Sequence, residues 1–304
     1  MPRCFTPTSI KIYRIFPGQT WYFYQMTYFI GYESALDILI WENSYSSRYC
    51  GGHPCGFSKT RATPKGGKRP DSNLLQSALL PSQLRSSDTV HVCIGEDSVR
   101  SRACGLSCHV WTGPKHGSFF GINDEFCVST PEACFIQMAG SLPLIHLIEL
   151  GFLLCGTYAP SAVDLPMTCG LQPLTSLSRL NNYIDRCGGE SGVVNARRAL
   201  KYVRNGSASV METKLTMLLC LPRMLGGIGL PLPELNAEIL IPSNLTGRTL
   251  TNVRRPDLFW PDRNVAVEYD SNEYHSVAER VVEDSRRKKR VDLMWHSMPC
   301  CALG

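Results

Sequence analysis

The chain has 304 residues, of which 43% are hydrophobic and 19% are charged, and its formal net charge is +5. This composition excludes a disordered chain, which would have fewer apolar residues and a larger net charge. The length suffices for two ordinary domains, and the mild basicity is compatible with a polyanionic partner without requiring one.

The 14 cysteines are the main compositional anomaly. The first residues lack the apolar core and the small-residue cleavage site of a secretory signal, so we expect a cytoplasmic protein with reduced thiols. Most cysteines are then small buried hydrophobic residues. Structural zinc is the alternative, but the pairs Cys50/Cys55 and Cys104/Cys108 are more widely spaced than a Cys-x-x-Cys pair.

The hydropathy pattern predicts no membrane-spanning helix. The best apolar run covers residues 135–154, and it contains Pro143, His146 and Glu149, each of which is costly in hydrocarbon. Two core helices that break at Pro143 explain this run better than a membrane span does.

Three segments are expected before residue 206. Residues 1–45 form an N-terminal helical segment, in which residues 30–42 place apolar side chains at helical spacing. Residues 46–85 form a basic linker rich in Gly, Ser and Pro, which is either a solvated loop or a contact to nucleic-acid phosphate. Residues 86–205 form an α+β region with alternating stretches and amphipathic helices.

The middle region contains clear local signals. Residues 89–94 and 126–129 are β-like. Thr130–Glu132 then combines an N-cap, a proline in the first turn and an acid at the positive end of the helix dipole. Further helices are expected over residues 144–154 and 193–203. Three basic residues of the last helix are expected to form a solvated face: Arg197, Arg198 and Lys201.

Residues 206–304 are expected to form an α/β domain in the order helix, strand, strand, strand, helix. The first helix begins at Ser209–Glu212, which has the form of a capping box. A closing helix is expected over residues 276–295. The three β-like stretches between the helices are residues 238–241, 255–260 and 264–270.

The stretch Val265–Asp270 carries the strongest chemical signal. Because side chains alternate along a strand, Glu268 and Asp270 share one face, roughly 7 Å apart. Asp257 belongs to the preceding strand, and a hairpin through Pro261–Asn264 can bring it beside Glu268. Three converging carboxylates suit Mg²⁺ or Mn²⁺, and such a metal lowers the pKa of bound water for phosphodiester hydrolysis.

These motifs resemble the PD-(D/E)XK restriction-endonuclease-like superfamily and, within it, the Vsr-like (very-short-patch-repair-like) domains. The resemblance is carried by Arg255-Pro256-Asp257 and Val267-Glu268-Tyr269-Asp270, and it covers about residues 207–296. It implies that Asp257 and Glu268 ligate metal and that Asp270 replaces the usual Lys.

The same resemblance implies roles for two further residues. Glu212 matches the acid of the family's first helix and would act through water in an outer shell. His275 is the best alternative general base, because the unperturbed pKa of histidine lies near neutrality. Simpler interpretations stay open: a capping box for Glu212, a turn for Asp257, a solvated strand face for Glu268 and Asp270, and a helix start for His275.

The expected closing helix contains the densest positive cluster of the chain, Arg286-Arg287-Lys288-Lys289-Arg290. These residues and Arg280 are candidates for nucleic-acid binding through phosphate contacts. The alternatives are a solvated helix and a surface ion-pair ladder of Arg280, Asp284 and Arg287.

The sequence therefore predicts a Mg²⁺-dependent DNA endonuclease with a C-terminal restriction-endonuclease-like domain. The last strand of that fold is expected to be truncated, because the chain ends at Met298–Gly304 and Pro299 suits a central strand poorly. Residues 126–139 resemble the middle of AbiEi-type antitoxin and regulator proteins. The alternatives are thus a non-catalytic DNA-binding regulator with a degenerate nuclease fold, and a damaged copy without activity. A protein partner and the oligomeric state stay open.

Overall fold

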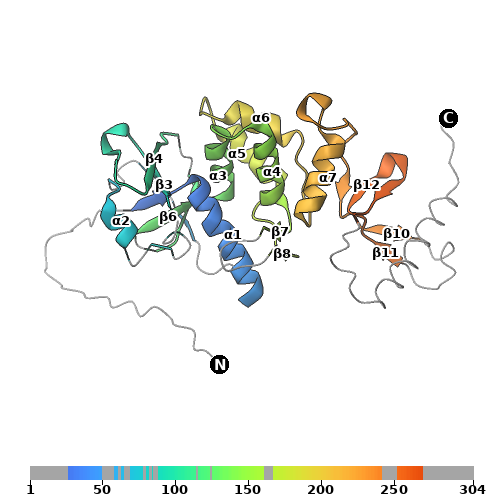
Figure 1. The fold of residues 1–304 in the computed structure, drawn as a ribbon, viewed down its shortest axis with the longest axis horizontal. Helices are drawn as coiled ribbons and strands as arrows, with labels where there is room; N and C mark the ends of the chain where they lie inside the picture. Colours follow the sequence, from blue (N-terminus) through green and yellow to red (C-terminus); the bar gives the residue numbers. More distant parts are fainter. Residues whose placement is uncertain are drawn as a thin grey trace.

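The structure is a computed structural model with a mixed α/β architecture (Figure 1). Helices α1 and α3 contact a six-stranded sheet, α4, α5 and α6 pack on α3 beside that sheet, and α7 with a three-stranded sheet follows. The structure describes the following residues: 27–49, 58–60, 63–64, 69–77, 80–81, 84, 88–113, 116–123, 125–160, 167–241 and 252–269.

The large sheet has the strand order β2-β5-β6-β1-β3-β4. Strand β1 pairs parallel with β6 and antiparallel with β3, and β3 pairs parallel with β4. Every side chain of β1 and β6 is buried, which is typical of central strands covered on both faces. The strands are β1 (Tyr28–Ile30), β2 (Ser58–Thr60), β3 (Val90–Ile94), β4 (Leu106–Val110), β5 (Phe119–Gly121) and β6 (Phe126–Ser129).

Four of these six strands were not predicted. Strands β4 and β5 lie in the expected α+β region, where only residues 89–94 and 126–129 were predicted as strands, and β1 and β2 come from segments in which no strand was expected. Strand β1 lies in the expected helical segment 1–45, and β2 lies in the expected linker 46–85, which also contains α2 (Ser72–Gln76). Both strands have three residues, which is too short for a periodic pattern. Their partner strands in the middle region supply the hydrogen bonds that make them strands.

Helix α3 lies at the centre of the core, and all nine of its residues are buried. A helix that is apolar on every side must be covered on every side, and α3 contacts α1, α4, α5 and α6. Its predicted start is confirmed, because Thr130 Oγ1 accepts a hydrogen bond from the Ala133 N–H at 3.4 Å and Pro131 follows the cap.

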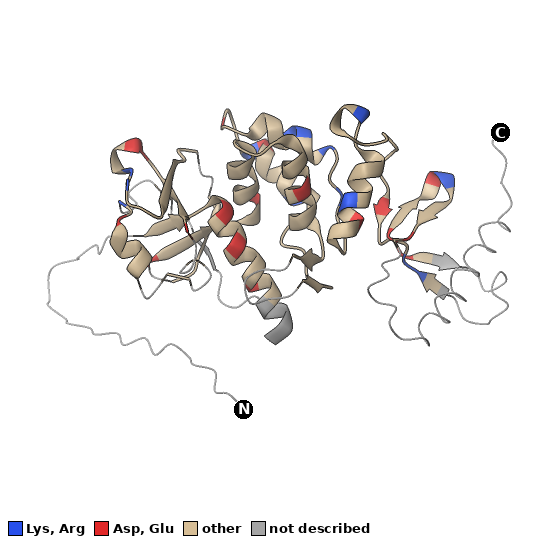
Figure 2. Cartoon of the chain, viewed as in Figure 1, with Lys and Arg blue, Asp and Glu red and all other residues tan. Residues whose placement is uncertain are grey.

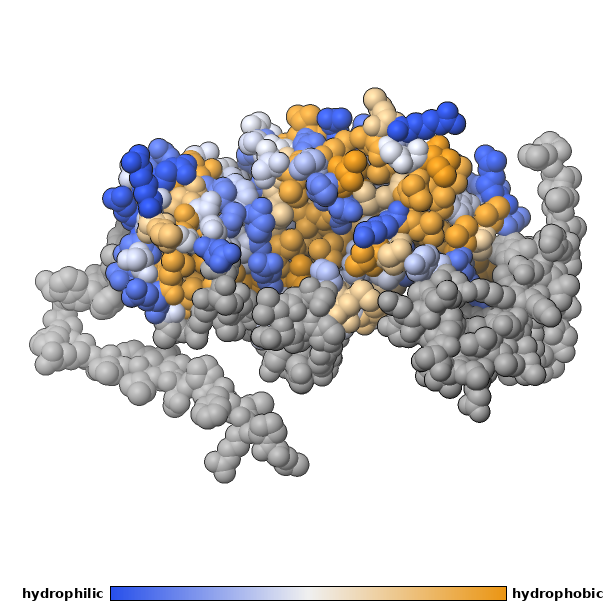
Figure 3. Space-filling view, in the orientation of Figure 1, coloured by the Kyte–Doolittle hydropathy of each residue, from blue (hydrophilic) through white to orange (hydrophobic). Residues whose placement is uncertain are grey.

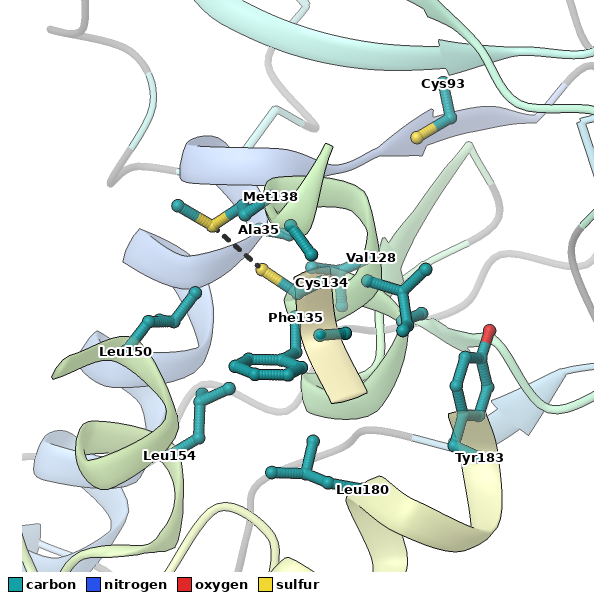
Figure 4. Close-up of a cluster of buried hydrophobic side chains, with 14 of the residues drawn as sticks. Ala35, Cys93, Val128, Cys134, Phe135, Met138, Leu150, Leu154, Leu180 and Tyr183 are labelled. Atoms are coloured by element: carbon teal, nitrogen blue, oxygen red, sulfur yellow. Dashed lines mark hydrogen bonds between the residues drawn. The ribbon is translucent and has the colours of Figure 1, made fainter. Parts of the chain in front are cut away.

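In Figure 4, Phe135 of α3 lies against Leu150 and Leu154 of α4, and Leu180 of α5 lies nearby. The helices around the core are α1 (Tyr32–Tyr49), α3 (Pro131–Ala139), α4 (Leu144–Cys155), α5 (Leu177–Arg186) and α6 (Val193–Leu200). The three helices expected around residues 30–42, 144–154 and 193–203 are therefore confirmed, with shifted ends. Short pieces complete this part: the 3₁₀ turn η2 (Asp97–Val99) and the paired strands β7 (Tyr158–Ala159) and β8 (Thr168–Cys169).

Seven of the nine described cysteines are buried. Burial raises the pKa of Cys93 and Cys134 above its ordinary value, so both remain protonated thiols at neutral pH. The prediction that cysteines act as small core residues is confirmed for this part of the chain. Among the described residues, no helix combines the length and the apolar composition that crossing a bilayer requires.

In the C-terminal part, α7 (Val210–Cys220) packs on a sheet with the order β13-β12-β9. Buried Cys220, Leu258 and Trp260 form the contact, together with partly buried leucines of α7. Strands β10 and β11 form a separate pair. The strands and turns are β9 (Glu234–Leu235), β10 (Ile239–Ile241), β11 (Asn252–Arg254), β12 (Leu258–Trp260), β13 (Val265–Val267), η3 (Arg223–Leu225) and η4 (Pro261–Arg263).

The predicted strands 238–241, 255–260 and 264–270 correspond to β10, β12 and β13, which are shorter than expected. Strands β9 and β11 were missed because two or three residues show no alternation. The expected helix 276–295 lies outside the described residues.

Candidate functional site

The hairpin of β12 and β13 places Asp257 and Glu268 at the same end of the small sheet. The strands pair antiparallel, with Leu258 opposite Val267. Asp257 precedes Leu258 and Glu268 follows Val267, so each acid lies one residue beyond the paired strands, at the same end of the hairpin. The predicted turn is confirmed, since η4 and Asn264, with φ of 49°, connect the two strands.

The Asp257 carboxylate is oriented across this hairpin by a backbone hydrogen bond. Its Oδ2 accepts from the N–H of Tyr269 at 2.5 Å. Its own carbonyl oxygen accepts from the N–H of Asn236 at 3.1 Å, on the opposite side of β12. The carboxylate therefore points toward the segment after β13, which begins with the exposed Glu268.

Glu212 is buried in the first turn of α7, with 7% of its surface exposed. Its N–H donates to Ser209 Oγ at 3.1 Å, and its Oε2 accepts from the Ala208 N–H at 2.8 Å. The predicted capping box is confirmed with one difference: the carboxylate reaches the residue before the N-cap instead of the N-cap itself. The Glu212 Oε2 also accepts from Asn236 Nδ2 at 2.7 Å.

Asn236 joins the two acidic positions and was missed by sequence reasoning. Its Nδ2 donates to Glu212 Oε2 and to the Gly206 carbonyl, while its N–H donates to the Asp257 carbonyl. Its φ of 52° is a left-handed conformation that asparagine adopts more readily than most residues. An asparagine directly after the apolar Leu235 was the available signal for a turn.

The donor set at this end of the sheet suits a hard cation, because carboxylate oxygens are the ligands that Mg²⁺ and Mn²⁺ prefer. Asp257 and Glu268 supply two carboxylates at the same end of the hairpin. The part of the chain that the structure describes holds no group of three or more His, Cys, Asp or Glu placed to bind a metal. Glu212 already accepts two hydrogen bonds at Oε2, which places it beside the pair rather than among its ligands.

Several predicted site residues lie outside the described residues. They are Asp270, His275, Arg280, Arg286, Arg287, Lys288, Lys289 and Arg290. Their roles therefore remain predictions from the sequence.

A second polar cluster, formed by Glu33, His91 and His109, lies at the edge of the large sheet and was not predicted. His91 Nδ1 lies 3.0 Å from Glu33 Oε2 and 3.0 Å from His109 Nε2. The Tyr32 ring stacks on His109 with the centroids 3.8 Å apart. Burial, and then the charge of His91, lowers the pKa of His109 to about 4, so this imidazole is neutral at pH 7. The cluster ties α1 to β3 and β4.

The geometry can be set beside known proteins. No family model matches the chain. It is 31% identical over 123 residues to two uncharacterized proteins of Mycobacterium tuberculosis, one from strain CDC 1551 and one from strain H37Rv. The match covers 40% of this chain and 41% of each relative, so the chain spans less than half of the relatives' length. No solved structure matches it.

Proposed function

We propose that this protein is a metal-dependent endonuclease that hydrolyses DNA phosphodiester bonds at an acidic centre formed by Asp257 and Glu268. The observation that supports the proposal is the β12–β13 hairpin, which brings both acids to one end of the sheet. The packing of α7 on this sheet fits the restriction-endonuclease-like fold that the motifs resemble.

In this proposal Asp257 and Glu268 hold Mg²⁺ or Mn²⁺, and Asp270 is the third ligand. When bound, the metal would polarise a phosphoryl oxygen of the DNA and lower the pKa of a water molecule bound to it. The Tyr269 N–H keeps the Asp257 carboxylate aimed across the hairpin. Asn236 and Glu212 act as positioning residues, because their hydrogen bonds fix the strand end that carries Asp257. His275 is proposed as the general base.

The alternative of a regulator rested on residues 126–139. These residues form β6 and α3, and every side chain of both elements is buried. The apolar pattern of this segment is accounted for by core packing, so the pattern by itself does not support a regulator. The nuclease proposal is therefore the one that the positions of the acids favour.

A plasmid-cleavage assay on the full chain tests the proposal. Supercoiled plasmid is incubated with Mg²⁺ or Mn²⁺ and with the parent, Asp257→Asn or Glu268→Gln. Each amide keeps the size of the carboxylate but removes the charge, so we expect cleavage to fall by about a hundredfold or more.

Asp262→Asn is the matched control, because Asp262 is an exposed acid in the turn of the same hairpin. We expect this variant to cut like the parent. A parent that cuts with neither metal, or an Asp257→Asn variant that cuts as fast as the parent, contradicts the proposal.

A further inference from the structure

Charge is distributed unevenly along the chain. Residues 88–176 contain eight Asp or Glu and three Lys or Arg, whereas residues 177–214 contain three Asp or Glu and seven Lys or Arg. The local net charge therefore changes from −5 to +4 within a protein whose total is +5. Figure 2 shows Lys and Arg along α6, the segment after it and α7, while Asp and Glu predominate on α1.

Some of these cations already have partners within the fold. Arg179 pairs with Glu132 at 2.9 Å, and Arg197 pairs with Asp185 at 3.0 Å. Arg186 lies over the ring of Tyr183, 5.2 Å from the ring centroid. Three others are exposed and have neither an ion pair nor such a ring contact with any residue that the structure describes: Arg198, Lys201 and Lys214. Their charge is available to a partner.

Core packing does not explain these three residues. Arg198 and Lys201 lie one turn apart on the exposed side of α6, and the buried side of that helix consists of small and apolar residues. Both cations also complement the negative end of the α6 dipole, which is their simplest structural role. That role does not extend to Lys214, because it lies in the middle of α7, more than one turn from the C-terminal end at which the dipole favours a cation.

The segment between Lys201 and Lys214 also helps to build the acidic centre. The Gly206 carbonyl accepts from Asn236 Nδ2 at 3.0 Å, and the Ala208 N–H donates to Glu212 Oε2 at 2.8 Å. The unpaired cations thus flank the chain segment that holds the positioning residues of the proposed site.

We propose that Arg198, Lys201 and Lys214 form a phosphate-binding surface for the backbone of duplex DNA. Exposed cations bind a polyanion by releasing its counterions, and contacts to phosphate position a duplex without reading its sequence. The choice of DNA as the polyanion rests on the proposed function. The surface would hold the duplex beside the segment that leads to the acidic centre.

Salt-dependent binding tests this surface. The full chain binds a labelled duplex in EDTA at several salt concentrations, so that metal-dependent cleavage does not interfere. The double variant Arg198→Gln/Lys201→Gln is expected to lower the slope of log K against log salt by about 2 and to weaken binding by roughly tenfold at low salt. Lys214→Gln is expected to lower the slope by about 1.

The matched control is Arg100→Gln/Arg102→Gln, which removes the same charge from exposed positions outside both the basic region and the linker of residues 46–85. We expect its slope to equal that of the parent. Equal slopes in the two double variants would overturn the surface, and tighter binding to an RNA of the same length would overturn its assignment to DNA.

The plasmid assay separates the two proposals. If the parent does not cut but the two double variants differ in slope, the nuclease proposal fails and the surface stands. If the parent cuts and the two double variants have the same slope, the surface fails and the nuclease proposal stands. Thermal unfolding of each variant confirms that these exposed substitutions leave the fold intact.

Discussion

The protein contains two helix-on-sheet regions that bury very different amounts of apolar surface. The region around α3 has one large core, which contains residues of the six-stranded sheet and of helices α1 to α6 and also reaches Met217 of α7. The three-stranded sheet packs on α7 through a small cluster of Cys220, Leu258 and Trp260, whereas Met217 of α7 packs into the large core. Around α7 and the segment after it, apolar side chains reach the surface (Figure 3), and Leu218 and Met224 are 55% and 90% exposed.

The region that provides most of the stability is therefore not the region that carries the proposed site. The proposed acids lie at the end of three-residue strands in the small region, where few apolar contacts resist opening. The large region contributes most of the burial and none of the proposed site. We therefore expect substitutions in the large region to lower the global stability and substitutions in the small region to cause local unfolding.

The largest expected loss of stability comes from truncating one buried side chain in each core. Phe135→Ala removes a fully buried ring from the large core, and we expect it to cost about 3–5 kcal/mol of unfolding free energy. Leu258→Ala removes a fully buried side chain from the small cluster, and we expect about 2–5 kcal/mol that is expressed locally. Urea unfolding measures the first, and regional amide hydrogen exchange measures the second.

The location of increased amide hydrogen exchange shows whether the two regions unfold independently. Leu258→Ala should raise exchange in α7 and β12–β13 while leaving α3 and α4 protected. Equal deprotection of both regions in this variant would show that they unfold as one unit.

The next effect concerns Asn236, which connects α7 to the small sheet. Asn236→Ala leaves the buried Glu212 carboxylate and the partly buried Gly206 carbonyl without the amide donor, at a cost of about 1–3 kcal/mol. It also places alanine in a left-handed conformation, which costs about 1 kcal/mol more. Urea unfolding of the variant measures the combined loss.

Asn236→Gly is the control, because glycine adopts the left-handed conformation without strain but lacks the amide. We expect it to be less destabilising than alanine and more destabilising than the parent residue. A glycine variant as stable as the parent would mean that the amide does not support Glu212.

The smallest effect concerns pH and the edge of the large sheet. Burial lowers the pKa of His109 from 6.5 to about 4 in the folded protein. Between these values the unfolded chain binds more protons, so the stability contributed by the neutral ring is complete above pH 6.5 and is lost as the pH falls toward 4. Because the side chain is partly exposed, we expect about 1 kcal/mol.

Unfolding measured at several pH values in the parent and in His109→Gln isolates this contribution. The stability difference between parent and variant should shift in favour of the variant as the pH falls through this window. A difference that does not change with pH would assign no such role to His109.

Local sequence patterns determined the elements whose signals are complete within a few residues. The cap at Thr130 and the capping box at Ser209–Glu212 were predictable because the residues that satisfy a helix start are neighbours of that start. The β12–β13 hairpin was predictable because a turn separates two apolar stretches. The position of Asp257 and Glu268 at one end of the small sheet follows from that hairpin.

Only the tertiary structure decided the features that depend on residues far apart in the chain. Strands β1, β2 and β9 are too short to show a period, and they are strands because partner strands accept and donate their hydrogen bonds. Asn236 became part of the site because α7 packs on the small sheet and brings Glu212 within 2.7 Å of its amide. Such contacts cannot be predicted from the spacing of residues along the chain, because tertiary packing brings the two groups together.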